Sequence, residues 1–179
     1  MRIIGGQYKR RTIKAPRGKL TRPTSDRTRE AIFNMVDSRL ELQGAQVLDL
    51  FAGTGALGLE ALSRGAASAT LVEQNPLVLR ISKDNAETLG AAEACSFLRM
   101  DAISYLKHHQ GAPFDLIMAD PPYELEQLPL LPELAFPHLT RDGCFVLEHD
   151  RRHDFSAHPQ CETARPYGRT VVSVFFAPD

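Results

Sequence analysis

The sequence lacks any apolar run long enough to cross a membrane. A transmembrane helix takes about 20 predominantly apolar residues, and no segment of the 179 residues offers one. The start of the chain, residues 1–15, also lacks the apolar stretch of a secretion signal. We therefore expect a cytoplasmic protein that works without a membrane partner.

Cysteines are few, and a phosphate-binding P-loop is missing. Cys95, Cys144 and Cys161 are odd in number and follow neither a disulfide framework nor a zinc-site spacing. Reduced thiols are the simplest interpretation. The Gly-rich segment that begins at Phe51 is not followed by the Gly-Lys-Ser/Thr of a P-loop.

Basic and acidic residues are divided unevenly along the chain. Residues 1–30 hold ten Lys and Arg against two acidic residues, whereas the remainder holds eleven against twenty. A basic end on an acidic body predicts a polyanionic partner, and a solvated tail is the alternative. We divide the chain into a basic arm, residues 1–24, and a main domain, residues 25–179.

Alternating strand and helix patterns predict an α/β fold. The arm indicates a short β-hairpin over residues 1–14, because glycines lie between two short apolar segments. A helix capped by Ser25 or Asp26 follows and ends at Gly44. Beyond it, strands separated by helices indicate βαβ units and a parallel sheet. The predicted strands are 46–50, 69–73, 95–98, 114–119 and 144–148, the predicted helices 56–64, 75–89, 101–109 and 124–138, and a final hairpin pairs 161–166 with 170–176.

Candidate ligand-binding residues follow the first three strands. Ligands of such sheets bind beyond the carboxyl ends of the strands. Asp49 leads into a Gly-rich turn through Gly53 and Gly55, where the backbone can approach a ligand closely, or merely turn tightly. Glu73 can accept hydrogen bonds from a ribose diol, and a solvated acid is the alternative. Asp101 can accept from an adenine amine, cap a helix, or do both.

Asp120-Pro121-Pro122-Tyr123 is the most specific motif. The prolines stiffen the chain and remove two N–H donors, so the corner presents acceptors only. The amino group of a nucleic-acid base is a poor nucleophile because its lone pair is delocalised. Acceptors on its two hydrogens favour a pyramidal nitrogen, and Tyr123 offers a face for stacking. The alternative is an ordinary Pro-Pro turn.

These motifs resemble those of class I methyltransferases that act on amino nitrogens through an (Asp/Asn)-Pro-Pro-(Tyr/Phe) motif. More specifically, the chain is similar to the RsmD-type small-subunit ribosomal RNA guanine-N2 methyltransferases, and the likeness covers nearly all of it. The matching segments are 1–6, 22–27, 29–34 and 51–65, together with 49–55, Glu73, Asp101 and 120–123.

The resemblance implies a Rossmann-like fold with a seven-stranded, mostly parallel sheet whose last strand is antiparallel. It also implies transfer of a methyl group from S-adenosylmethionine to a guanine N2 of 16S ribosomal RNA in the small subunit. The cofactor residues would be Asp49, Phe51, Gly53, Gly55, Glu73, Asp101 and Ala102, and the catalytic residues Asp120, Pro121 and Tyr123.

The target base must leave its stack to reach such a pocket. Phosphate contacts are expected from the arm, at Lys9, Arg10, Arg11, Lys14 and Arg22. Arg165, Tyr167 and Arg169, on the final hairpin, either face RNA or solvent. His149, His153 and His158 lie near two aspartates, but methyl transfer from a sulfonium needs no Lewis acid, so we expect no metal. The expected oligomeric state is a monomer.

Three other activities remain open. A DNA adenine-N6 or protein glutamine methyltransferase would share the pocket but not the basic arm. A non-catalytic RNA-binding assembly factor would have no need of Asp120. A nicotinamide-dependent oxidoreductase could use the spacing of Gly53, Gly55 and Gly58, but it has no use for Asp-Pro-Pro-Tyr.

Overall fold

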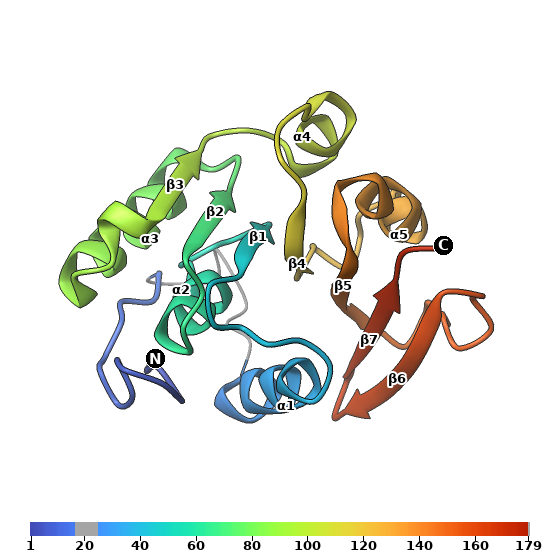
Figure 1. Ribbon diagram of the computed structural model, residues 1–179, viewed down its shortest axis with the longest axis horizontal. Helices are drawn as coiled ribbons and strands as arrows, with labels where there is room; N and C mark the ends of the chain where they lie inside the picture. Colours follow the sequence, from blue (N-terminus) through green and yellow to red (C-terminus); the bar gives the residue numbers. More distant parts are fainter. Residues whose placement is uncertain (17–24, 179) are drawn as a thin grey trace.

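A computed structural model describes residues 1–16 and 25–178 of the chain (Figure 1). Arg22, expected to contact RNA, lies outside the described residues. Among these residues the helices are α1 (Asp26–Asp37), α2 (Ala56–Ser63), α3 (Pro76–Leu89), α4 (Ala102–His108) and α5 (Leu131–Ala135). The strands are β1 (Gln46–Leu50), β2 (Ser68–Val72), β3 (Cys95–Leu98), β4 (Phe114–Ala119), β5 (Leu139–Asp150), β6 (Cys161–Tyr167) and β7 (Thr170–Phe176).

The seven strands form one sheet in the order β3-β2-β1-β4-β5-β7-β6. Strands β1 to β5 run parallel, and β7 is inserted antiparallel between β5 and β6. The expected seven-stranded sheet with an antiparallel last strand is therefore confirmed. Strand β1 is the topological switch point of the sheet, because β2 pairs with it on one side and β4 on the other. Ligands of α/β sheets bind at such switch points.

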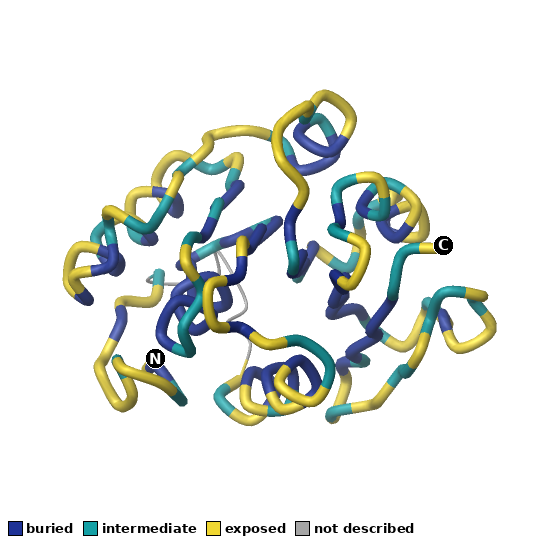
Figure 2. Tube along the Cα trace, viewed as in Figure 1, coloured by how far each residue is buried: buried dark blue, intermediate teal, exposed yellow. Residues whose placement is uncertain are grey.

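Helices cover both faces of the sheet. Alternate residues of each central strand point to opposite faces. In β1, Val47 packs with α1 and α2, whereas Leu48 packs with α4 and α5. Helix α3 and the arm share a third cluster with β2. Figure 1 shows the resulting three layers, and in Figure 2 the central strands are buried along most of their length.

The helices begin where the sequence offers caps. Ser25, Asn75 and Asp101 each accept hydrogen bonds from backbone N–H groups in the first turn of α1, α3 and α4. Helix α1 ends at Asp37, before the predicted end at Gly44. None of the helices within 1–16 and 25–178 combines the length and apolar character that a membrane crossing requires.

The predicted N-terminal hairpin is wrong. Residues 1–14 contain a single isolated bridge, between Arg2 and Thr12, and no strand. The reason is that the backbone donors of Ile4 and Gly5 go to the buried carboxylate of Glu60, at 2.8 and 2.7 Å. Ile3 lies fully buried in the same docked arm. Backbone hydrogen bonds donated by Ile3, Arg10 and Ile13 still join residues 1–3 to residues 10–13. Beyond this short pairing the arm is fastened to α2, so no strand forms.

The predicted helix over 124–138 is also wrong as a continuous element. Its residues form two short 3-10 turns on either side of α5. Pro129, Pro132 and Pro137 each remove a backbone donor, so an unbroken ladder of helical hydrogen bonds cannot form.

Candidate active site

A cavity of about 750 Å³ opens beyond the carboxyl ends of β1, β2, β4 and β5. This volume falls within the range of about 300–1,000 Å³ that is typical of ligand pockets. The described residues that line it include nine of the ten predicted catalytic and cofactor residues: Asp49, Phe51, Gly53, Glu73, Asp101, Ala102, Asp120, Pro121 and Tyr123.

The loop after β1 is shaped by left-handed backbone. Phe51 has a φ of 57° and Gly53 a φ of 56°. Such a conformation costs a residue with a side chain about 1–2 kcal/mol, and strain of this kind gathers at functional sites. The turn lets Ala52 donate to the carbonyl oxygen of Val72, which binds the loop to the end of β2.

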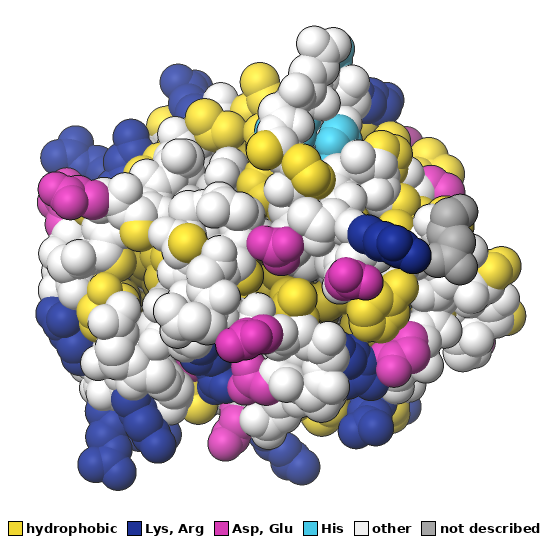
Figure 3. Space-filling view, viewed as in Figure 1, with side chains coloured by type: hydrophobic (Ala, Val, Ile, Leu, Met, Phe, Trp, Pro, Cys, Tyr) yellow, Lys and Arg dark blue, Asp and Glu magenta, His cyan; other side chains and the backbone are white. Residues whose placement is uncertain are grey.

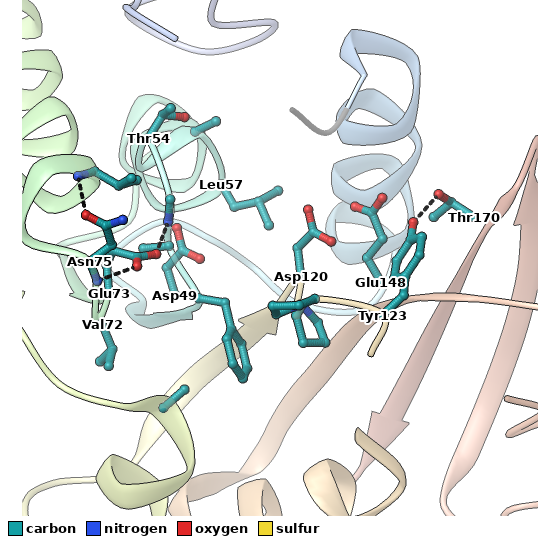
Figure 4. A pocket seen from close by; sticks show the side chains of 18 of the residues that line it. Asp49, Thr54, Leu57, Val72, Glu73, Asn75, Asp120, Tyr123, Glu148 and Thr170 are labelled. Carbon is teal, nitrogen blue, oxygen red and sulfur yellow. Dashed lines mark hydrogen bonds between the residues drawn. The ribbon is translucent and has the colours of Figure 1, made fainter. Parts of the chain in front are cut away.

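Glu73 joins the two loops that flank the cavity. Its carboxylate accepts from the N–H of Gly53 at 3.1 Å and from the N–H of Asn75 at 2.8 Å. Because a carboxylate offers about four lone-pair positions, two remain for a ligand. Asn75 also lines the cavity while capping α3 (Figure 4), a role that the sequence analysis did not assign.

Asp49 is buried at the end of β1, with 1% of its surface exposed. One oxygen accepts from the N–H of Gly58 at 2.8 Å, and a Cβ on Gly58 would lie 3.2 Å from that oxygen, a tight contact that would press on the carboxylate. Burial raises the pKa of Asp49 to about 7. The hydrogen bond from Gly58 acts to lower this pKa, and the nearby charges of Asp120 and Glu73 act to raise it.

Gly55 does not line the cavity. It has a φ of 79° at the start of α2, and a Cβ there would come within 2.9 Å of the Leu71 side chain. Its place in the structure is the close packing of α2 on β2.

Asp101 and Ala102 mark the other end of the cavity. Asp101 accepts from the N–H of Ser104 at 2.8 Å, so the predicted helix cap is present. Its neighbour Met100, with 43% of its surface exposed, completes this wall with an apolar side chain. Ala102 is buried and small, which leaves the space open.

The Asp120–Tyr123 corner faces the glycine loop across the cavity. Figure 4 shows the carboxylate of Asp120 directed into the same space as Asp49 and Glu73. The phenol oxygen of Tyr123 lies 2.8 Å from the hydroxyl of Thr170 on β7. The backbone oxygen of Tyr123 accepts from Arg152 at 3.2 Å. The corner is therefore held from two further elements of the chain.

Glu148 is a lining residue that the sequence analysis missed. It stands at the end of β5 with 5% of its surface exposed. It follows Leu147, whose partner Ala119 precedes Asp120, so the two carboxylates stand on neighbouring strands. Figure 4 shows them pointing into the same space. An acid at a strand end was the available signal, but its place beside Asp120 requires the strand order.

The cavity is strongly acidic. Among the described residues that line it, Arg169 is the only basic one. The acidic lining residues are Asp49, Glu73, Asp101, Asp120, Glu124 and Glu148. Such a lining favours cationic ligands and hydrogen-bond donors, and it disfavours a buried phosphate or pyrophosphate.

The predicted RNA contacts of the arm fall into two groups. Lys9 and Arg10 are exposed, and their side chains make no hydrogen bond or ion pair with the described residues, although their backbone N–H groups donate to Gly6 and Ile3. Arg11 donates to the carbonyl oxygens of Thr88 and Leu89 at the end of α3, and Lys14 lies 3.5 Å from Asp84. In Figure 3, Lys and Arg side chains gather at the lower left, where Figure 1 places the arm.

Of the three histidines, His149 is built into the core, while His153 and His158 are half-buried. His149 is buried and lies 2.8 Å from both the Ser173 hydroxyl and the Asp150 carbonyl oxygen. Over the described ranges, no three His, Cys, Asp or Glu side chains are arranged to hold a metal ion.

Two bacterial proteins are similar to this chain in sequence. YlbH of Bacillus subtilis, provisionally named an rRNA methyltransferase, is 40% identical over 84% of this chain and 83% of its own length. Ribosomal RNA small subunit methyltransferase D of Escherichia coli is 44% identical over 69% of this chain. That match spans 60% of the Escherichia coli protein.

Solved structures give the same relationship at the level of the fold. The Escherichia coli protein yhhF, provisionally described as a methyltransferase, is 33% identical with a TM-score of 0.84, covering 99% of this chain and 97% of its own. An RNA methyltransferase from Salinibacter ruber, solved in complex with S-adenosyl-L-homocysteine, has a TM-score of 0.68 over 88% of this chain and 94% of its own. At 17% identity it shows the fold alone.

The fold is thus that of a class I methyltransferase. The family model described as conserved hypothetical protein 95 matches residues 1–176, nearly the whole chain. With YlbH and methyltransferase D as relatives, this chain belongs to that family and is of the RsmD/YlbH type.

Proposed function

We propose that this chain transfers a methyl group from S-adenosylmethionine to the exocyclic N2 of a guanine in 16S ribosomal RNA. The observation that carries the proposal is the corner at 120–123, which faces an acidic, ligand-sized cavity. The names of its relatives, an rRNA methyltransferase and a small-subunit methyltransferase, support the substrate class.

The cavity fits the proposed cofactor. Its acidic lining suits a molecule whose sulfur and amine are both positively charged. Glu73 keeps lone-pair positions for two ribose hydroxyls while Gly53 and Asn75 hold it in place. Asp101 and Ala102, which also line the cavity, would meet the adenine. When bound, S-adenosylmethionine supplies an electrophilic methyl group on a positively charged sulfur.

The corner residues act on the guanine amine. Asp120 and the carbonyl oxygen of Pro121 accept its two N–H groups, which turns the nitrogen lone pair toward the glycine loop. Tyr123 stacks on the base, a contact worth about 1–3 kcal/mol. Alignment of the reacting atoms can supply about 7–11 kcal/mol of the barrier reduction. Asp120 or water takes the proton that the nitrogen loses once it has been methylated.

Glu148 favours guanine over adenine as the target. Guanine carries N1–H beside its N2 amine, so adjacent carboxylates at Asp120 and Glu148 would meet donors only. Adenine carries an N1 lone pair beside its N6 amine, which a carboxylate at Glu148 would repel. This argument separates the proposal from adenine-N6 methylation by the same corner.

The arm offers exposed basic side chains to an RNA strand. The side chains of Lys9 and Arg10 are exposed and have no partner among the described residues, so they can contact phosphates without breaking the fold. We assign residues 1–24 as the RNA-contacting arm of the main domain.

The decisive experiment uses small ribosomal subunits from cells that lack this protein. The subunits are incubated with the protein and labelled S-adenosylmethionine, and the RNA is digested to nucleosides. We expect label in N2-methylguanosine. Label in N6-methyladenosine would overturn the base assignment, and no label in any nucleoside would leave the assembly-factor alternative in its place. A thermal shift with S-adenosylhomocysteine but not NAD is expected, and the reverse would favour an oxidoreductase.

A further inference from the structure

A shallow groove of about 510 Å³ lies beside the acidic cavity. It is lined by Asp150, Arg151, Arg152, Gly168 and Arg169. These residues come from the end of β5 and from the turn between β6 and β7. We refer to it as the arginine groove.

The arginine groove is continuous with the cavity. Gly168 and Arg169 line both spaces. In addition, Arg152 donates from its guanidinium to the backbone oxygen of Tyr123 at 3.2 Å, so one wall of the groove touches the corner itself. A ligand whose base is held at the corner would therefore extend directly into the groove.

The charges of the two spaces are opposite. The groove has three arginines against one acid, Asp150, which forms an ion pair with Arg152. Arg151 donates to the carbonyl oxygen of Gly168 at 2.8 Å, which orients its guanidinium along the groove. Arg169 is exposed and makes no hydrogen bond or ion pair with any residue in the described ranges.

A nucleotide divides its chemistry in the same way. Its base can donate hydrogen bonds to carboxylates, whereas its phosphates are repelled by them and attracted by guanidinium groups, which bind phosphate oxygens in a bidentate manner. The acidic cavity thus requires that the phosphates flanking an extruded base stay outside it. The arginine groove is the adjoining space with the charge to hold them.

We propose that the arginine groove binds the sugar–phosphate backbone next to the target base, through Arg151 and Arg169. The identity of that base rests on the proposed function, but the groove's preference for an RNA backbone does not. The arm and the arginine groove then hold the strand at two separate places, and the groove sets the position of the base.

The test compares single variants Arg151→Ala and Arg169→Ala with a matched control, Arg141→Ala. Arg141 is exposed near the start of the same strand that ends beside Arg151. With about 3.3 Å per residue, it lies near the opposite end of the sheet. All three variants lose one positive charge. Arg151→Ala also loses the hydrogen bond to Gly168, whereas Arg169→Ala and Arg141→Ala differ only in place.

The first measurement is the Kd for a single-stranded oligoribonucleotide over about 50 to 200 mM KCl. We expect each groove variant to raise Kd about tenfold at low salt, as for loss of one charge-assisted hydrogen bond. The slope of log Kd against log salt should fall by about 0.7 for each lost phosphate contact. Arg141→Ala should match the wild type in both.

The second measurement separates this proposal from the proposed function. Arg151→Ala should raise the KM for unmethylated small subunits more than it lowers kcat. If wild type and Arg151→Ala have the same Kd, salt slope and KM, and the wild type methylates its substrate, backbone binding by the groove is refuted. The proposed methyltransferase activity is then unaffected. If the groove variants lose RNA binding but the wild type shows no methylation, backbone binding by the groove is supported. The proposed methyl transfer is then refuted.

Discussion

The phenol oxygen of Tyr123 lies 2.8 Å from the hydroxyl oxygen of Thr170, which joins the corner after β4 to the first residue of β7. Thr170 is buried and Tyr123 is partly exposed at the cavity wall (Figure 4). A tyrosine ring has two rotatable bonds, and a hydrogen bond at its far end restrains both. The antiparallel strand β7 therefore helps to set the plane of the Tyr123 ring.

The hydrogen bond between Tyr123 and Thr170 should contribute to base positioning. Tyr123→Phe and Thr170→Val are each expected to reduce kcat/KM by about 2- to 13-fold, which corresponds to about 0.5–1.5 kcal/mol for one hydrogen bond. Because both remove the same contact, the double variant should be little worse than either single variant. Steady-state kinetics on small subunits measures this double-mutant cycle. Additive losses in the double variant would contradict a coupling between Tyr123 and Thr170.

The Asp120 carboxylate should be needed for transfer more than for cofactor binding. Asp120→Ala is expected to lower kcat by roughly 10²–10³, the range for loss of one positioned electrostatic contact in an enzyme site. Binding of S-adenosylhomocysteine, followed by calorimetry, should persist. Asp142→Ala, an exposed acid at the other end of the sheet, is the control for charge. Full activity in Asp120→Ala would remove the role that we assign to the corner.

Glu148 should select guanine. Glu148→Gln replaces one acceptor with an amide donor, so the contact with guanine N1–H weakens and the repulsion of adenine N1 disappears. We expect kcat/KM for guanine to fall by roughly 10- to 150-fold, since a hydrogen bond to a charged group is worth about 1.5–3 kcal/mol. Nucleoside analysis with model RNAs that carry guanine or adenine at the target position measures the ratio. An unchanged ratio would be inconsistent with base reading by Glu148.

Much of the fold was predictable because its signals are local. The strands at 95–98 and 114–119 were located to the residue, since each is an apolar run between turn-forming residues. The break in the predicted 124–138 helix also has a local signal, its three prolines. The prediction followed the hydrophobic spacing instead of these prolines. These elements needed no knowledge of the rest of the chain.

Features that depend on distant partners could not be predicted. The arm is not a hairpin because Ile4 and Gly5 donate to Glu60, 56 and 55 residues away. Glu148 and Thr170 reach the cavity only because β5 lies beside β4 and β7 lies beside β5. Spacing along the chain identifies the motifs at 49–55 and 120–123, whereas strand order decides which other side chains join them.

Asp49 should make the stability of the cofactor-free protein depend on pH. Its pKa is raised from 3.8 to about 7, first by burial and then by Asp120 and Glu73. Between these two values the folded protein retains a proton that the unfolded chain has lost, so this contribution is present at low pH and is lost as pH rises toward 7. Each pH unit corresponds to about 1.4 kcal/mol, so the whole loss is about 4 kcal/mol.

Asp49→Asn removes this titration and keeps an oxygen for the N–H of Gly58. Urea denaturation of both proteins across the range from pH 4.5 to 7.5 gives the comparison, since groups remote from Asp49 titrate alike in each. We expect the free energy of unfolding of the wild type to fall relative to Asp49→Asn as pH rises. Parallel profiles would mean that Asp49 stays ionised in the fold.

Docking of the arm on α2 should depend on the missing side chain of Gly6. Gly6 has a φ of 72°, and a Cβ there would lie 1.7 Å from the backbone oxygen of Ser63, which no rotamer change can relieve. Gly44 has a similar φ of 79°, but a Cβ there would meet nothing within 4 Å. Gly6→Ala and Gly44→Ala therefore share the backbone cost of about 1–2 kcal/mol, and only the first adds a clash.

Denaturation and limited trypsin digestion distinguish the two variants. Gly44→Ala should lose about 1–2 kcal/mol of stability and retain the slow cleavage of the wild type after Lys9, Arg10 and Arg11. Gly6→Ala should be cleaved quickly there, because Ile4 and Gly5 can no longer reach Glu60 without moving α2. Equal cleavage of both variants would show that the arm tolerates the clash, and docking through Glu60 would then not be what holds it to the sheet.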